Sequence, residues 1–173
     1  LWKWGLPAKK IMPELISGCD VLIGNEEDAE KVLGIKAPNT DVSTGRVDSE
    51  NYHYVLEEIK SQFPNLRTIA ITLRSSISAT HNRWSAIMQH DNKIYESKKY
   101  DIDFIVDRIG SGDAFASGLI YGLCRQNNDP QITLDFATGA AVLKHSILGD
   151  FNLVSVDDVK QLISGDGSGR VVR

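Results

Sequence analysis

The chain has 173 residues, of which 42% are hydrophobic and 24% charged, a composition typical of a soluble globular protein with one core. We therefore expect one domain over residues 1–164, followed by a flexible Gly/Ser-rich tail over residues 165–173. A formal net charge of -4 without a Lys/Arg run argues against a nucleic-acid partner. No segment suits a membrane span, and we expect a cytoplasmic protein. Cys19 and Cys124 lie in apolar segments without metal-ligand spacing, which predicts buried free thiols.

Helical and strand patterns alternate through the first part of the chain. The predicted elements are a helix over 8–17 interrupted by Pro13, a buried strand over 19–24, a helix over 25–34, a polar loop over 35–47 and a helix over 49–63. The last helix places Tyr52, Val55, Leu56 and Ile59 on one face, so we expect that face to be buried.

The second part opens with a β-branched strand and ends in helices. Its predicted elements are a strand over 67–73, a Ser-rich loop over 74–78, a hairpin of 83–89 and 93–100 joined by Asp91-Asn92, and helices over 113–126, 130–147 and 156–163. Strands that alternate with helices favour an α/β fold with a mostly parallel sheet, and the hairpin adds an antiparallel part at one side.

The stretch DRIGSGDAF, over residues 107–115, carries the clearest chemistry. Gly110 and Gly112 allow backbone angles closed to other residues and let a ligand approach the main chain. Consecutive amides at a helix start form an anion-binding concavity, and the helix dipole adds a favourable field. A transferring phosphoryl group would fit there, with Asp113 placed to accept the proton of an alcohol. The alternative is structural: Ser111 caps the helix and Asp113 complements its dipole.

The longer stretch DRIGSGDAFASGLIYGL closely resembles the C-terminal signature of the ribokinase-like (PfkB) sugar kinases, usually D-T-x-G-A-G-D-x-F. The stretches VLIGNEEDAEKVLG, ITLRSSISATHNRWSAIM and LKHSILGDFNLVS are similar to one branch, the 2-dehydro-3-deoxygluconokinases. The resemblance covers nearly the whole chain and implies a ribokinase-like layered fold, a mostly parallel sheet flanked by helices. Because the family's sugar-binding residues and lid would precede Leu1, it also implies that the chain is only the C-terminal, ATP-side part of a kinase.

The resemblance implies a role for each residue of the signature. It makes Asp113 the catalytic base for the sugar hydroxyl. It assigns the backbone anion hole to three residues: Gly110, Ser111 and Gly112. Asp107 matches a position associated with a monovalent cation such as K⁺, and its alternative is a strand-end carboxylate that accepts backbone hydrogen bonds. Arg108 stands where the family usually has Thr and Ser111 where it has Ala, so a small residue is kept in the anion hole.

The resemblance also implies a metal site and a nucleotide site. Asn25 and Asp28 match the family's N-x-x-E position, linked to Mg²⁺ and phosphates, whereas the spacing by itself favours a capping box. Thr72, Arg74 and Ser75 match the nucleotide-binding T-L-G-x-x-G turn, where Arg74 replaces Gly and is either a phosphate contact or a surface charge. Three small residues match the adenine-facing helix and equally suit helix packing: Ala137, Gly139 and Ala140. The histidines share no ligand spacing and are interpreted as structural or exposed: His53, His81, His90 and His145.

The activity implied by the resemblance is ATP-dependent phosphorylation of a sugar acid, 2-dehydro-3-deoxy-D-gluconate, by a carbohydrate kinase that uses Mg²⁺. The alternatives are another ribokinase-like kinase, acting on a sugar or a nucleoside, and a non-catalytic nucleotide-binding module. The isolated chain is expected to bind nucleotide without catalysing transfer. It is also expected to pair with a second copy or with the missing N-terminal part through an exposed sheet edge or apolar face.

Overall fold

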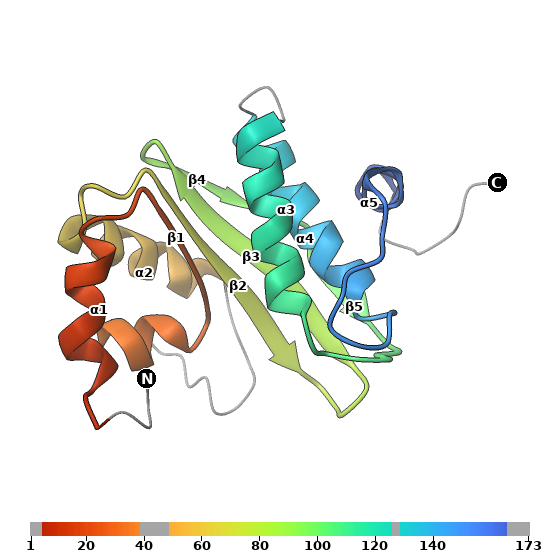
Figure 1. Cartoon of the computed structure of the whole chain (residues 1–173), viewed down its shortest axis with the longest axis horizontal. Coiled ribbons are helices and arrows are strands. Elements are labelled where there is room, and N and C mark those ends of the chain that lie inside the picture. Colours follow the sequence, from red (N-terminus) through yellow and green to blue (C-terminus); the bar gives the residue numbers. More distant parts are fainter. Residues whose placement is uncertain (1–4, 39–48, 126–128, 166–173) are drawn as a thin grey trace. The chain divides into compact units, whose positions relative to one another are not determined.

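The computed structural model describes residues 5–38, 49–125 and 129–165. The chain is a mixed α/β protein in which helices flank a five-stranded sheet (Figure 1). Its contacts divide it into two compact units, residues 1–75 with 87–96, and residues 76–86 with 97–173. The single domain expected over 1–164 stays a prediction. The expected tail lies outside the described residues from position 166 onward.

The first unit places helices against a parallel strand pair. Its elements are α1 (Ala8–Ile16), β1 (Val21–Asn25), η1 (Ala29–Leu33), α2 (Ser49–Gln62), most of β2 (Thr68–Ser76), the end of β3 (Asn82–His90), and β4 (Lys93–Glu96). Strands β1 and β2 are parallel, with Val21 opposite Thr68 and Asn25 opposite Thr72. The predicted apolar face of α2 is confirmed, because four of its side chains lie in the core at 2% exposure or less: Tyr52, Val55, Leu56 and Ile59.

The helix predicted over 25–34 is shorter in the structure. Residue Asn25 still belongs to β1, and a turn follows it before the short π-helix η1 begins at Ala29. Gly34 ends this element with a φ of 80°, as its position predicted. The polar residues 25–28 therefore form a turn at the end of a strand.

The predicted hairpin is confirmed at its turn. Strands β3 and β4 are antiparallel with His90 opposite Lys93, so Asp91 and Asn92 alone connect them. These two residues have φ values of 46° and 66°, the left-handed angles of a two-residue type I′ turn. Arg67 donates from Nε and Nη2 to the two carboxylate oxygens of Asp91, both at 2.9 Å. This bidentate ion pair holds the turn beside the start of β2.

Strand β2 extends beyond its predicted end. Residues 74–76, expected in a loop, continue the strand to Ser76, although the register with β1 stops at Thr72. The turn comes later, where the amides of Ile77 and Ser78 both donate to the carbonyl of His81 at 3.0 Å. Serine has little strand propensity, so ladder pairing rather than local preference sets this boundary.

The strand predicted over 93–100 is split in two. Strand β4 ends at Glu96, and β5 (Tyr100–Ile102) pairs with the start of β3, with Tyr100 opposite Trp84. Between the two strands, the Ser97 hydroxyl accepts the amide of Ala86 at 2.8 Å. A side-chain oxygen thus takes the place of a main-chain acceptor. The stretch between Glu96 and Tyr100 has one residue more than the facing stretch of β3 between Trp84 and Ile87, which makes a bulge.

The second unit is built on closely packed helices. Its elements are the start of β3, β5, α3 (Ser111–Arg125), α4 (Pro130–Lys144) and α5 (Val156–Ser164). Helices α3 and α4 run side by side (Figure 1). A Cβ on Gly118 would lie 2.8 Å from the Cα of Ala137, so the missing side chain permits this approach. Helix α4 ends at Lys144, before the predicted residue 147, because the following amides bond to carbonyls three residues back.

The sequence also led to expectations about membrane-spanning helices and about the two cysteines. No helix in the described ranges is long and apolar enough to cross a bilayer. The prediction of buried thiols is wrong, since Cys19 and Cys124 are both free and exposed. Cys19 lies in the turn after α1 and Cys124 in the last turn of α3, where apolar sequence neighbours do not determine which side faces solvent.

A buried acid that the sequence gave no reason to expect lies in the turn after β1. Glu26 is 7% exposed, and its Oε1 lies 3.6 Å from Nε of Arg74 near the end of β2. Burial raises the pKa of the Glu26 carboxyl above its usual value, and the nearby backbone amides and the Arg74 guanidinium oppose this rise.

Glu26→Gln tests this burial through the pH dependence of stability. The unfolded chain ionises Glu26 at its ordinary pKa and the folded chain only at a higher one, so the wild type loses free energy of unfolding as the pH rises through that interval. Relative to wild type, Glu26→Gln should gain stability in urea unfolding as the pH rises above about 4.3, the ordinary pKa of a glutamate. Glu27→Gln, one residue along and paired with Lys31, is the control. A Glu26→Gln variant that loses stability relative to wild type with rising pH would contradict the assignment.

Gly118→Ala tests the packing of α3 on α4. Alanine favours a helix over glycine by up to about 1 kcal/mol, but its Cβ would overlap Ala137 and overpack the interface. The variant should lose about 1–3 kcal/mol of unfolding free energy in chemical denaturation. Ser117→Ala, at an exposed position of the same turn, is the control. A Gly118→Ala protein more stable than wild type would show that the helices are not in close contact.

Candidate active site

The signature turn in the second unit depends on a glycine in a left-handed conformation. Gly110 has a φ of 77°, and a Cβ there would lie 2.2 Å from the carbonyl oxygen of Asp150. Helix α3 begins immediately afterwards, with the Ala114 amide donating to the Gly110 carbonyl at 2.8 Å. The turn therefore lies directly against the segment that follows α4, and glycine is the residue that fits.

Asp107 connects the same two segments. Its Oδ1 accepts the Ile109 amide at 3.0 Å, and its Oδ2 accepts the Gly149 amide at 2.9 Å. These two amides lower the pKa of the Asp107 carboxyl below its usual value, with a smaller contribution from the Lys144 ammonium. The contacts match the structural interpretation of Asp107 as a carboxylate that holds the backbone. A direct cation contact would have to share oxygens that already accept hydrogen bonds.

The first amides of α3 are open. Ser111 donates from its hydroxyl to the Arg108 carbonyl at 3.0 Å, so this side chain does not cap the helix. The Ser111 amide makes a long 3.4 Å contact with the same carbonyl. The amides of Gly112 and Asp113 donate to no group within the described part of the chain. A Cβ on Gly112 would meet nothing within 4 Å, so the space beside these donors is free for a ligand.

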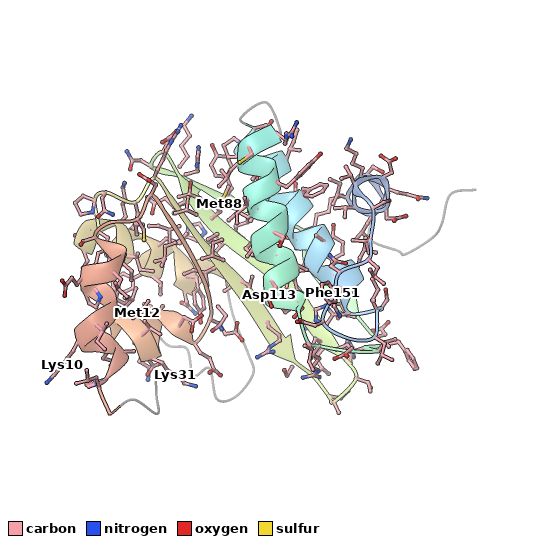
Figure 2. The ribbon with its side chains drawn as sticks, in the orientation of Figure 1. Lys10, Met12, Lys31, Met88, Asp113 and Phe151 are labelled. Atoms are coloured by element: carbon pink, nitrogen blue, oxygen red, sulfur yellow. The ribbon has the colours of Figure 1, made fainter. Side chains whose placement is uncertain are left out.

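Asp113 lies in the first turn of α3, at the same end as these amides (Figure 2). Its side chain is exposed, and no described residue forms a hydrogen bond or an ion pair with it. The carboxylate is thus neither sealed inside the protein nor paired with a cation of the described chain. Two open amide donors and an open proton acceptor at one helix end suit the handling of a phosphoryl group and a hydroxyl.

Asn25 and Asp28, in the first unit, are joined by reciprocal hydrogen bonds. Oδ1 of Asn25 accepts the amides of Glu27 and Asp28 at 2.8 and 3.1 Å, and the Asn25 amide donates to Oδ2 of Asp28 at 2.8 Å. This reciprocal arrangement matches the capping interpretation. Oδ1 of Asp28 remains as a possible metal ligand, which is compatible with Mg²⁺ because that ion keeps several waters and uses one or two carboxylates.

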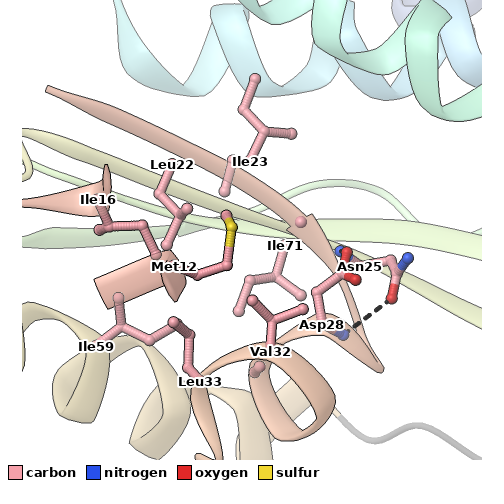
Figure 3. Close-up of a pocket in the computed structure, with 13 residues that line it drawn as sticks. Met12, Ile16, Leu22, Ile23, Asn25, Asp28, Val32, Leu33, Ile59 and Ile71 are labelled. Atoms are coloured by element: carbon pink, nitrogen blue, oxygen red, sulfur yellow. Dashed lines mark hydrogen bonds between the residues drawn. The ribbon is translucent and has the colours of Figure 1, made fainter. Parts of the chain in front are cut away.

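Asn25 and Asp28 also border a cavity of about 220 Å³ in the first unit (Figure 3). The wall is almost entirely apolar, with side chains from α1, β1, η1, α2 and β2, such as Met12, Leu22 and Ile71. Apart from Asn25 and Asp28 at its border, this lining offers no polar side chain for a phosphate or a sugar. The cavity is therefore part of the core rather than a ligand site.

The residues predicted to form a nucleotide-binding turn, Thr72 and Arg74, lie in the second half of strand β2. Thr72 is 6% exposed, and its hydroxyl approaches the Gly24 carbonyl at 3.5 Å. The guanidinium of Arg74 pairs with the buried Glu26, so it is not simply a surface charge. Ser75 is partly buried in the same strand. Nucleotide binding by these residues stays a prediction.

The three small residues of α4 have different surroundings. Ala137 is fully buried where α4 meets α3, and a Cβ on Gly139 would lie 2.9 Å from Cγ2 of Ile163 in α5. These positions match the helix-packing interpretation. Ala140 also lines a cavity of about 370 Å³ in the second unit, together with Phe136 and the exposed Phe151. Ala140 is thus the one of the three that borders open space.

His81 belongs to a cluster that sequence spacing does not reveal. Its Nε2 lies 3.1 Å from Oδ1 of Asp101 and 3.1 Å from Oδ1 of Asp103. The antiparallel register, with Asn82 opposite Ile102, places His81, just before β3, beside Asp101 in β5 and Asp103 just after it. Arg83 shares Asp101 at 3.1 Å, and hydrogen bonds from His81 and Arg83 lower the pKa of that carboxyl. The cluster is a network of polar contacts beside the start of β3, and the Arg83–Asp101 contact in it is an ion pair.

Comparison with known proteins identifies the family of the chain. The model of the pfkB family of carbohydrate kinases matches residues 1–150. A crystal structure of 2-dehydro-3-deoxygluconokinase from Thermotoga maritima is 42% identical, with a TM-score of 0.81 over 91% of this chain and 46% of that chain. A putative 2-keto-3-deoxygluconate kinase from Enterococcus faecalis is 27% identical, with a TM-score of 0.72 over 96% of this chain and 48% of that one.

A curated relative gives a shorter match. The 2-dehydro-3-deoxygalactonokinase of Haloferax volcanii is 28% identical over 94 residues, which are 54% of this chain and 29% of the relative. The chain thus spans less than half the length of the relatives and structures named here. The family model nevertheless covers most of the sequence, including the signature turn and the start of α3. The chain belongs to the pfkB family of carbohydrate kinases.

Proposed function

We propose that the protein phosphorylates a hydroxyl of a sugar acid with ATP, and that the substrate is 2-dehydro-3-deoxy-D-gluconate. The observation that carries the proposal is the start of α3, where Asp113 is exposed. Among the described residues its carboxylate has no partner, and the amides of Gly112 and Asp113 have no acceptor. The substrate is supported by the 42% identity to the Thermotoga maritima 2-dehydro-3-deoxygluconokinase.

The chemical roles follow from the open groups. The amides of Gly112 and Asp113, at the positive end of the helix, hold the oxygens of the transferring phosphoryl group. The Asp113 carboxylate takes the proton of the sugar hydroxyl as the new O–P bond forms. The bond from the γ-phosphorus to the bridging oxygen breaks, and ADP leaves with that oxygen. Charge stabilisation by fixed main-chain donors is the major contribution expected in such a step.

The proposal includes Mg²⁺ as the ion that neutralises phosphate charge. Asp28, with Asn25 as its partner in the turn, would hold it through the carboxylate oxygen that accepts no hydrogen bond. Thr72, Arg74, Ser75 and Ala140 remain proposed nucleotide contacts. A K⁺ contact at Asp107 has less support, because backbone amides already occupy both carboxylate oxygens.

Asp113→Asn tests the base. The amide side chain keeps the shape of the acid but cannot accept a proton, so kcat of the full-length protein should fall at least about 100-fold while ATP affinity changes little. Turnover is measured with a coupled ADP assay and ATP binding by calorimetry. Ser117→Ala, one turn further along α3, is the control. Near-normal turnover in Asp113→Asn would end the base assignment.

Gly112→Ala tests the anion hole. Outside the neighbouring residues of its own helix, no atom of the described chain lies within 4 Å of the added Cβ, so the fold should be kept. A phosphoryl group held by the amides would meet the new methyl group. We expect at least about a tenfold loss in kcat/KM for ATP and an unfolding midpoint no lower than that of the wild type, because alanine favours a helix over glycine. A variant with normal kcat/KM for ATP would place the phosphates elsewhere.

Two alternatives are distinguished by the same assays. The family also includes kinases of other substrates, and a panel of sugar acids, fructose, ribose and nucleosides identifies the preferred alcohol. The chain spans 46% of the Thermotoga maritima kinase, which favours a nucleotide-binding module as the behaviour of these 173 residues alone. Calorimetry that shows ATP binding without sugar binding supports that module. Pairing with a second copy or with a further part of the chain stays a prediction.

A further inference from the structure

We propose that Arg108 is a positioning residue for phosphoryl transfer, which fixes the main chain that presents the open amides of Gly112 and Asp113. The inference rests on the proposed function of the turn at the start of α3. It concerns a position where the family usually has Thr, so it assigns a role to a departure from the family pattern.

The Arg108 side chain reaches back to the turn that connects β2 and β3. Its Nη2 lies 3.0 Å from the carbonyl oxygen of Ser78, 2.6 Å from that of Ala79 and 3.3 Å from Oδ1 of Asn82. A planar guanidinium donates in fixed directions and stays charged, so these contacts define the position of the Arg108 backbone. Charge-assisted hydrogen bonds of this kind are among the stronger ones in proteins.

The main chain of the same residue holds the start of α3. The Arg108 carbonyl accepts the Ser111 hydroxyl at 3.0 Å and the Ser111 amide at 3.4 Å. Ser111 directly precedes the two open amides. The Arg108 side chain therefore contacts the 77–82 segment, while its carbonyl holds the anion-binding turn, so the residue connects the two.

The segment that receives the guanidinium is itself well fixed. The Ile105 amide donates to the Thr80 carbonyl at 3.1 Å, and His81 pairs with Asp101 and Asp103. Asn82 is fully buried. A rigid acceptor site makes Arg108 an effective anchor, whereas a threonine side chain would be too short to provide these contacts.

The role predicts a specific kinetic effect. Amides that stabilise a transition state must keep their position closely, and small misplacements have large effects on rate. Arg108→Met keeps much of the side-chain length and removes all donors. In the full-length protein we expect kcat to fall at least about tenfold and KM for ATP to change less than about threefold.

Two further variants separate positioning from general stability. Arg83→Met, the matched control, removes an arginine whose side chain pairs with Asp101 and makes no hydrogen bond to the Arg108 acceptors in the described part of the chain. It should keep kcat within about twofold of wild type. Arg108→Lys carries three ammonium donors for the same acceptors and should recover most of the lost kcat. If Arg108→Met does not fold, Arg108→Gln is used instead. Its side chain has fewer donors than arginine and is shorter, so the same fall in kcat is expected. All rates are measured below the unfolding temperature of each variant.

Amide hydrogen exchange gives a readout independent of turnover. The peptide that covers residues 109–116 should exchange faster in Arg108→Met than in wild type or Arg83→Met. A kcat loss shared by Arg83→Met, no kcat loss in Arg108→Met, or no recovery in Arg108→Lys would overturn the inference. If the wild type shows no turnover, the proposed function fails, and the exchange result alone decides whether Arg108 fixes the turn.

Discussion

Helix α3 begins without the caps that complete the other helices of its unit. Asp129 accepts two amides at the start of α4, and Ser155 and Asp158 form a capping box at the start of α5. At α3 the residue before the helix is Gly110, which has no side chain, and the Ser111 hydroxyl donates elsewhere. Amide donors without partners at a helix start favour an anion. The proposed chemistry depends on this open end.

The surrounding contacts keep that end open and in place. Asp107 ties the residues before the turn to Gly149, and the close approach of Gly110 to Asp150 leaves no room for a side chain. Arg108 adds a connection to the segment between β2 and β3. All of these groups belong to the second unit, so one compact part of the chain holds both the proposed anion site and Asp113.

The sequence predicted features that depend on local chemistry. The Asp91-Asn92 turn, the buried face of α2 and the start of a helix near Asp113 all follow from residue type and spacing. The membership of the pfkB family, expected from the signature, is confirmed by the family model. In each case the signal lies within a few consecutive residues or one helical period.

The missed features depend on residues far apart in the sequence. Glu26 is buried beside Arg74 of strand β2, and the contacts of His81 with Asp101 and Asp103 depend on the register of β3 with β5. The bulge at Ser97 depends on a side chain replacing a main-chain acceptor. The contacts of Arg108 join segments about 30 residues apart. Propensity and periodicity carry no information about such contacts.

The most direct test of the open helix end is an NMR titration of the ¹⁵N-labelled protein with a non-hydrolysable ATP analogue. The amide signals of Gly112 and Asp113 should shift as the analogue is added. Their titration curves should saturate at the same analogue concentration as those of its phosphorus signals. Saturable binding of the analogue that leaves both amides unmoved would contradict the assignment of this turn as the phosphate site.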